Sequence, residues 1–129
     1  MRAESHIKAF DEHKKTLIDW GIKTRGLENS QRTVGLHASR AIIELLSAYL
    51  HEKGLITLGA QLNHRWFKSP KAGNKLPEFS KKEEVVNKLH KLENLCEELA
   101  YGSDKPKKEI EEAIALFQDL EKTIEDLRK

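Results

Sequence analysis

The segment from Asn29 to Gly54 constrains the fold more than any other part of the sequence. Its apolar residues recur at intervals of three and four positions, which places them along one face of an α-helix. Small residues lie among them, and small side chains let a neighbouring helix approach closely. We therefore expect the central, most buried helix of a small bundle here. The apolar positions are Val34, Ala38, Ala41, Ile42, Leu45, Leu46 and Tyr49, and the small ones include Ser39, Ser47 and Ala48.

The N-terminal segment predicts a second amphipathic helix, from about residue 3 to residue 20. Phe10 and Leu17 lie on its apolar side, and His6 and His13 are assigned to its wetter side. Gly21 and Gly26 then favour a turn before the central helix.

Two more helices are expected in the second half of the chain. Ser80 and Glu83 have the Ser-x-x-Glu spacing of a capping box, and an apolar stripe follows them as far as Gly102. Asp104 and Pro106 suit the start of a last helix, which continues almost to the C-terminus with the spacing of a bundle helix.

Four such helices predict an all-α, antiparallel, up-and-down four-helix bundle, with residues 1–129 as one domain and residues 55–79 as a longer connection. A chain of 129 residues is long enough to bury a core without disulfides or metals. Cys96 is the single cysteine, so no disulfide forms within the chain. Because the sequence shows neither a signal peptide nor an apolar run of membrane-spanning length, we expect a cytoplasmic protein that does not bind membranes.

The formal net charge of +2 conceals opposite charges in the two halves of the chain. Residues 1–82 contain 15 Lys and Arg against 8 Asp and Glu, whereas residues 83–129 contain 8 against 13. The basic stretch at residues 64–82 is suited to attract phosphates or an acidic protein surface. The alternative is a solvated loop whose charge is balanced by the acidic C-terminal helix of the same molecule or of a partner subunit.

The run HASRAIIELLSAYLHEKG, from His37 to Gly54, resembles the second helix of HEPN domains (higher eukaryotes and prokaryotes nucleotide-binding), which are small all-α proteins. The later run LENLCEELAYGSDKPKKEIEEAIALFQDLEKTIEDL is similar to the closing helix pair of that family. The resemblance implies a homodimer and, as a protein partner, a nucleotidyltransferase-like protein. The matching positions of the second helix are His37, Ala38, Ala41, Leu45, Leu46, Leu50, Lys53 and Gly54.

Ribonucleases of the HEPN family carry an arginine and a histidine four to six residues apart, and Arg32 and His37 have that spacing. Histidine moves a proton near neutral pH, and arginine stabilises negative charge on a phosphate. The pair lies at the start of the second helix, whereas the family carries it late in the bundle, near Tyr101 in this chain. The resemblance therefore implies the fold and dimerisation more than RNA cleavage. As catalytic residues, Arg32 and His37 would have to converge across a two-fold axis. The alternative is a surface Arg32 and a His37 hydrogen-bonded inside the bundle.

A second candidate site is the segment around His64. Its cations are suited to hold a phosphate, and Trp66 is suited to stack on a base, as in many proteins that bind single strands. The alternative is that Trp66 and Phe67 attach the loop to the core while their neighbours face water. The candidate residues for binding a nucleotide or nucleic acid are Arg40, His64, Arg65, Trp66 and Lys68.

Metal binding is less favoured by the sequence. His90, Glu93 and Glu97 share one side of the third helix, near Cys96. A dinuclear carboxylate site in a bundle needs Glu-x-x-His pairs on other helices, and the sequence has none. We therefore expect neither a metal nor a cofactor, and we interpret these residues as solvated helix charges.

Three functions follow from the sequence. The favoured one is a catalytically degenerate HEPN-like module that acts as a dimer or as a protein-interaction partner. The second is a protein that binds RNA or a nucleotide at an Arg/His site, or a metal-independent ribonuclease. The third is a purely structural helical bundle.

Overall fold

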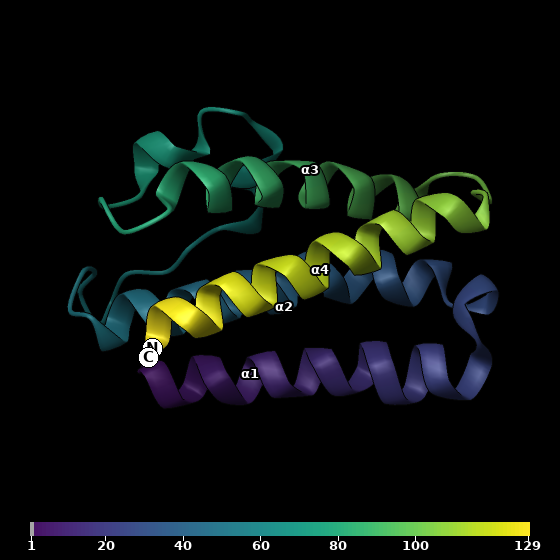
Figure 1. The fold of residues 1–129 in the computed structure, drawn as a ribbon, viewed down its shortest axis with the longest axis horizontal. Coiled ribbons are helices and arrows are strands. Elements are labelled where there is room, and N and C mark those ends of the chain that lie inside the picture. Colours follow the sequence, from purple (N-terminus) through teal and green to yellow (C-terminus); the bar gives the residue numbers. More distant parts are fainter. Residues whose placement is uncertain (1) are drawn as a thin grey trace.

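Four amphipathic helices make up the bundle, and each runs opposite to the one before it (Figure 1). They are α1 (Ala3–Lys15), α2 (Gln31–Glu52), α3 (Lys82–Tyr101) and α4 (Lys107–Arg128). The structure is a computed structural model that describes residues 2–129, and it contains no β-strand in that range. The predicted all-α four-helix bundle is therefore confirmed.

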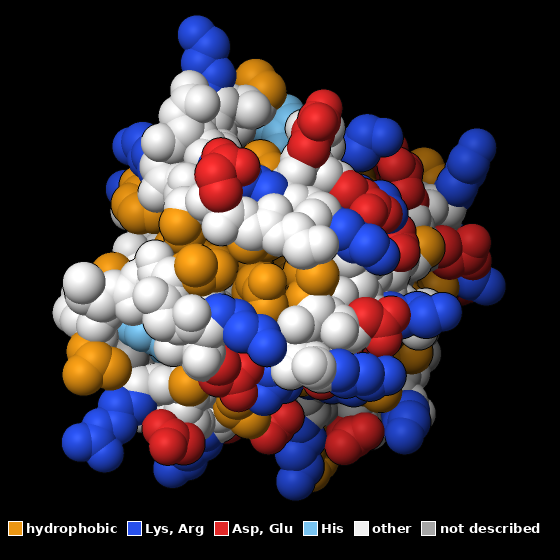
Figure 2. Space-filling model, turned by 60° about the vertical axis from the view of Figure 1, so that its left-hand side comes forward, with side chains coloured by type: hydrophobic (Ala, Val, Ile, Leu, Met, Phe, Trp, Pro, Cys, Tyr) orange, Lys and Arg blue, Asp and Glu red, His pale blue; other side chains and the backbone are white. Residues whose placement is uncertain are grey.

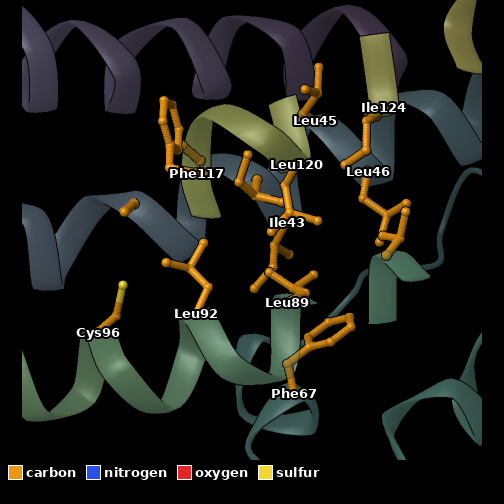
Figure 3. Packing of buried hydrophobic residues seen from close by; sticks show 14 of the residues in the cluster. Ile43, Leu45, Leu46, Phe67, Leu89, Leu92, Cys96, Phe117, Leu120 and Ile124 are labelled. Carbon is orange, nitrogen blue, oxygen red and sulfur yellow. The ribbon is translucent and has the colours of Figure 1, made fainter. Parts of the chain in front are cut away.

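Helix α2 lies at the centre because 14 of its 22 residues are buried, so it packs against α1, α3 and α4 alike. Figure 3 shows Ile43 and Leu46 of α2 gathered with Leu89 of α3 and Leu120 of α4. Phe67 of the connection joins this cluster and is fully buried. Burial of each such side chain contributes about 1.5–3 kcal/mol. The segment from Asn29 to Gly54 is thus the axis of the core.

The contact between α2 and α3 is closest at Gly35. A Cβ atom at this position would lie 2.4 Å from the backbone nitrogen of Ala100 and 2.7 Å from the carbonyl oxygen of Cys96. Any side chain at position 35 would therefore push the two helices apart. The packing distance between α2 and α3 is set by the absence of a side chain at one residue.

The first helix extends further than the sequence predicted. After Lys15 the chain continues as a π-helix, η1 (Thr16–Lys23), before it turns through a short 3-10 helix, η2 (Leu27–Asn29). Gly21 does not break this helix, because its bare backbone packs against α2, where an added Cβ would lie 3.1 Å from Thr33. Tertiary packing here outweighs the low helix propensity of glycine.

The ends of the helices only partly follow the predicted signals. Gly54, after α2, has a left-handed backbone with φ of 67°, and the amide of Leu55 donates to the carbonyl of Leu50 at 2.8 Å, as in a Schellman motif. Ser30 directly precedes α2, and its hydroxyl donates to the carbonyl of Gly26 instead of capping α2. Burial of Ser30 in the turn explains this choice of partner.

The predicted capping box of α3 does not form. Lys81 is the residue before α3, and it adopts a left-handed backbone with φ of 62°, so the helix starts later than Ser80 implied. Likewise Pro106, not Asp104, directly precedes α4. The turns around these residues therefore fix where the two helices begin.

Ion pairs connect the two oppositely charged halves of the chain within the molecule. They join α1 to α4, the 3-10 helix η3 (His64–Lys68) to α3, and α2 to α4. Figure 2 shows basic and acidic side chains interspersed around a central area of hydrophobic side chains. Within residues 2–129, no helix is both long and apolar enough to cross a membrane. The pairs are Lys14–Glu121, Lys68–Glu97 and Glu52–Arg128.

We predict that Gly35→Ala lowers the free energy of unfolding by about 2 kcal/mol, because the added methyl group meets backbone atoms that cannot move aside. Gly59→Ala is the matched control, because an added Cβ there meets nothing within 4 Å. Urea unfolding followed by circular dichroism measures both. Equal stability of the two variants would show that α2 and α3 tolerate a wider separation.

Candidate anion-binding site

A pocket of about 290 Å³ lies between α2, α3 and the connection that joins them. On the α2 side its wall begins at Gly35, so the close approach of the two helices places α2 and α3 side chains around the same space. Of the candidate binding residues from the sequence, all but Trp66 line it. The lining residues with polar or aromatic side chains are Ser39, Arg40, His64, Arg65, Lys68, Glu93, Glu97 and Tyr101.

The connection contributes to this pocket through η3 (His64–Lys68), a 3-10 helix. Asn63 starts η3, because its side-chain oxygen accepts a hydrogen bond from the amide of Arg65 at 2.9 Å. Phe67 points into the core and anchors η3. His64, Arg65 and Lys68 are therefore held on an anchored turn.

Polar side chains on one face of α3 contact η3 and hold it in position. The Nδ1 of His90 donates to the carbonyl of Phe67 at 2.9 Å, and the ammonium of Lys68 lies 2.7 Å from a carboxylate oxygen of Glu97. Asn94 adds a longer contact to the carbonyl of Lys68. The interpretation of His90, Glu93 and Glu97 as solvated helix charges was incomplete, because they orient the connection.

His64 and Glu93 form a histidine–carboxylate pair in the pocket. The Nδ1 of His64 lies 3.1 Å from Oε1 of Glu93. Glu93 is only 5 % exposed, and its Oε2 has no hydrogen-bond partner among residues 2–129. Hydrogen bonding through Nδ1 leaves Nε2 of His64 for a second partner. A buried carboxylate that holds one ring nitrogen of a histidine fixes the orientation of the ring.

Two arginines give the pocket its excess of positive charge. Lys68 and His64 are matched by Glu97 and Glu93, but neither Arg40 nor Arg65 forms an ion pair with a carboxylate in the described part of the chain. A guanidinium group without a carboxylate partner is able to bind a phosphate through two parallel hydrogen bonds. The pocket is thus suited to an anion.

Arg32 and His37 are not brought together within one chain. Arg32 donates from one guanidinium nitrogen to the carbonyls of Leu99 and Gly102, at 2.9 and 2.6 Å, and so satisfies the C-terminal end of α3. His37 instead lies against α1, with its Nδ1 3.0 Å from that of His13. Both residues make contacts that stabilise the fold, and their catalytic role stays a prediction.

Trp66 lies outside the pocket lining. It packs partly buried against the core, and the ammonium of Lys75 lies 5.2 Å from the centre of its ring. The aromatic residue that lines the pocket is Tyr101, whose side chain is 72 % exposed. Trp66 thus has the anchoring contacts that the sequence offered as the alternative to base stacking.

Glu93 and Tyr101 are among the pocket residues that were not predicted as ligand-binding. Glu93 was considered only as a metal ligand, and its contact with His64 depends on how the connection folds back on α3. The sequence offered only a weak indication that Tyr101 lines a binding site. Tyr101 is a large aromatic residue that lies just after Leu99, the last buried position of the apolar stripe of α3. Exposed aromatic residues next to a loop are often used for binding.

Cys96 and the acidic residues near it do not form a metal site. No group of three or more His, Cys, Asp and Glu side chains within residues 2–129 is arranged to hold a metal ion. Burial raises the pKa of the Cys96 thiol to about 12, so the thiol is protonated at neutral pH. Cys96 therefore acts as a core side chain.

No protein-family model, no curated protein and no solved structure matches this chain at a significant level.

We predict that Arg32→Ala lowers the free energy of unfolding by about 1–3 kcal/mol, because two carbonyls at the end of α3 lose a charged donor. Arg25→Ala is the control, since Arg25 is exposed and forms no ion pair within residues 2–129. Thermal and urea unfolding of both variants measure the difference. Wild-type stability of Arg32→Ala would remove the structural explanation for this arginine.

Proposed function

We propose that the protein is a HEPN-like helical module whose pocket binds a phosphate-bearing ligand, such as a nucleotide or the backbone of RNA. The observation that carries this proposal is the position of Arg40 and Arg65, which line one pocket without carboxylate partners in the described part of the chain. Arg40 is half-buried and Arg65 is exposed, so both guanidinium groups are accessible to an anion that enters the pocket and could form charge-assisted hydrogen bonds with it.

The remaining side chains favour a ligand with more than a free phosphate. Tyr101 offers an exposed ring on which a base could stack. The side chains of Lys68 and Glu97, which form an ion pair, are each about 40 % exposed, so the ammonium of Lys68 also contacts solvent. Exposed ion pairs contribute only up to about 1 kcal/mol, so Lys68 can turn toward a phosphate at little cost.

The resemblance to HEPN domains also supports a homodimer and a nucleotidyltransferase-like protein partner. Neither requires catalysis, and within one chain Arg32 contacts α3 whereas His37 contacts α1, which agrees with a degenerate active site. The proposed module thus combines a ligand pocket with an assembly role.

We predict that the double variant Arg40→Gln/Arg65→Gln binds adenosine monophosphate and a short single-stranded RNA at least tenfold more weakly than the wild type. Each lost charge-assisted hydrogen bond corresponds to about 1.5–3 kcal/mol, and about 1.4 kcal/mol is a factor of ten. Fluorescence anisotropy with labelled RNA and calorimetry with the nucleotide measure binding at fixed salt.

Arg25→Gln is the matched control, because it removes one exposed positive charge away from the pocket lining. Equal weakening in the control would indicate a nonspecific electrostatic effect. Binding by the double variant as strong as that of the wild type would contradict the proposal.

A ribonuclease is the second candidate, and the pair of His64 and Glu93 is the observation in its favour. With Nδ1 held by Glu93, Nε2 of His64 could accept the proton of a ribose 2′-hydroxyl, and Arg65 could stabilise the charge on the phosphate. This arrangement would use one chain only.

If the protein is a ribonuclease, we predict that His64→Ala lowers the cleavage rate of single-stranded RNA at least a hundredfold, whereas His37→Ala leaves it unchanged. The assay contains EDTA, and gel electrophoresis follows the RNA. Intact RNA with the wild type would support the degenerate module. Loss of cleavage in His37→Ala but not in His64→Ala would instead identify the pair of Arg32 and His37.

A further inference from the structure

Four of the six histidines meet where α1 packs against α2. On α1 and the first turn of η1, the side chains that face α2 alternate between imidazole and hydrocarbon, since His6, Phe10, His13 and Leu17 follow one another at steps of four and three residues. The sequence predicted His6 and His13 on the wetter side, and this was wrong, because His6 is only 3 % exposed and His13 is half-buried. We call this contact the histidine seam.

Helix α2 presents a matching set of residues at seven-residue spacing. His37, Glu44 and His51 lie two helical turns apart, so they form a row on one face of α2. Because α1 and α2 are antiparallel, His13 meets His37 and His6 meets Glu44 and His51. These four histidines and Glu44 make up the seam.

The contacts in the seam are short. Nδ1 of His13 lies 3.0 Å from Nδ1 of His37, and Nδ1 of His6 lies 2.6 Å from a carboxylate oxygen of Glu44. The rings of His6 and His51 stack, with centroids 5.1 Å apart. The seam is therefore an ordered contact between the helices.

The contact between His13 and His37 permits only one proton between the two Nδ1 atoms. One nitrogen donates and the other accepts, so a proton on both would place two N–H groups against each other. At the other end, the Nε2 atoms of His6 and His51 are buried without a hydrogen-bond partner among residues 2–129. A proton on either atom would be a buried donor without an acceptor, which is unfavourable.

The charges around His13 and His37 favour neutral imidazoles on balance. Burial is the main cause that lowers the pKa of His13 and of His37, and the positive charge of Arg40, one turn from His37 on α2, lowers both further. Glu44 of α2 and Glu12 of α1 oppose this effect at His13. The carboxylate of Glu121, on α4, forms an ion pair with Lys14 of α1.

The pKa of His51 is also lowered, first by burial and then by His6, against a hydrogen bond to the backbone of Ala60. A histidine whose pKa is lower in the folded state binds protons less readily there than in the unfolded chain. Its contribution to stability is therefore complete above the ordinary value of about 6.5 and is lost as the pH falls below it.

The topology allows α1 to open locally. Among the four helices, α1 packs extensively only on α2, whereas α2, α3 and α4 all pack on one another. Figure 1 shows α1 along one side of the bundle. The contact of α1 with α4 includes one ion pair, between Lys14 and Glu121. Separation of α1 from α2 would therefore leave the mutual contacts of the other three helices intact.

We propose that the histidine seam is a pH-sensitive contact that holds α1 on α2 when its imidazoles are neutral and loosens α1 in mild acid, while α2, α3 and α4 remain packed. Proton uptake by His13, His37 and His51 breaks the shared hydrogen bond and places like charges together. The remaining contacts of α1, which include Phe10, the ion pair of Lys14 with Glu121 and the contact of His6 with Glu44, then hold the helix less firmly.

We predict that, from pH 7.5 to pH 5.5, the backbone amides of α1 lose hydrogen-exchange protection at least tenfold more than those of α3, after correction for intrinsic exchange rates. Mass spectrometry of the full chain measures both helices in one experiment. The double variant His13→Gln/His37→Gln should reduce this difference at least threefold, because its neutral side chains do not titrate. Lys8→Gln, which replaces an exposed side chain of α1 outside the seam, is the control and should keep the full difference.

Two results would overturn the proposal. One is an equal loss of protection in α1 and α3, which would indicate global unfolding. The other is titration of His13, His37 and His51 at or above a pKa of about 6.5 when their ring carbons are followed by NMR in the wild-type protein. The NMR measurement decides the question even if the double variant does not fold.

Discussion

The rest of the structure depends on the close contact between α2 and α3 at Gly35. Because no side chain separates the helices there, the backbone of α2 lies directly on that of α3 at Cys96 and Ala100. This contact brings Arg40 of α2 to the same pocket as Glu93 of α3. A wider separation would move the two walls of the pocket apart, so the packing of the core and the geometry of the site have the same origin.

Helix α2 combines two roles that usually belong to different elements. It supplies the largest share of the buried residues, and it also carries the polar residues of two separate contacts. Arg40 lines the pocket on one side, whereas His37 and Glu44 face α1 on another. A helix surrounded by partners has little free surface, so polar residues such as His37 and Glu44 are matched to a specific neighbour.

The sequence predicted the four helices because apolar periodicity records which face of each helix is buried. It also identified Arg40, His64, Arg65 and Lys68, which the fold brings to one pocket. The periodicity could not show that the imidazole of His6 is buried, because a polar side chain is expected to face water. His6 can occupy a core position because its ring contacts the carboxylate of Glu44. That partner, Glu44, lies 38 residues away, and only the tertiary fold brings the two together. The capping signals failed for a related reason, since they describe isolated helix ends and not the turns that pack around them.

The burial of Cys96 has a chemical consequence. Thiol reagents react with the thiolate, and the raised pKa of Cys96 leaves almost none of it at neutral pH. The sulfur also lies 3.8 Å from the carbonyl of Val34, in the interior of the contact between α2 and α3. Its rate of alkylation would therefore report how often these two helices separate, and the native chain contains its own probe of that motion without any engineered label.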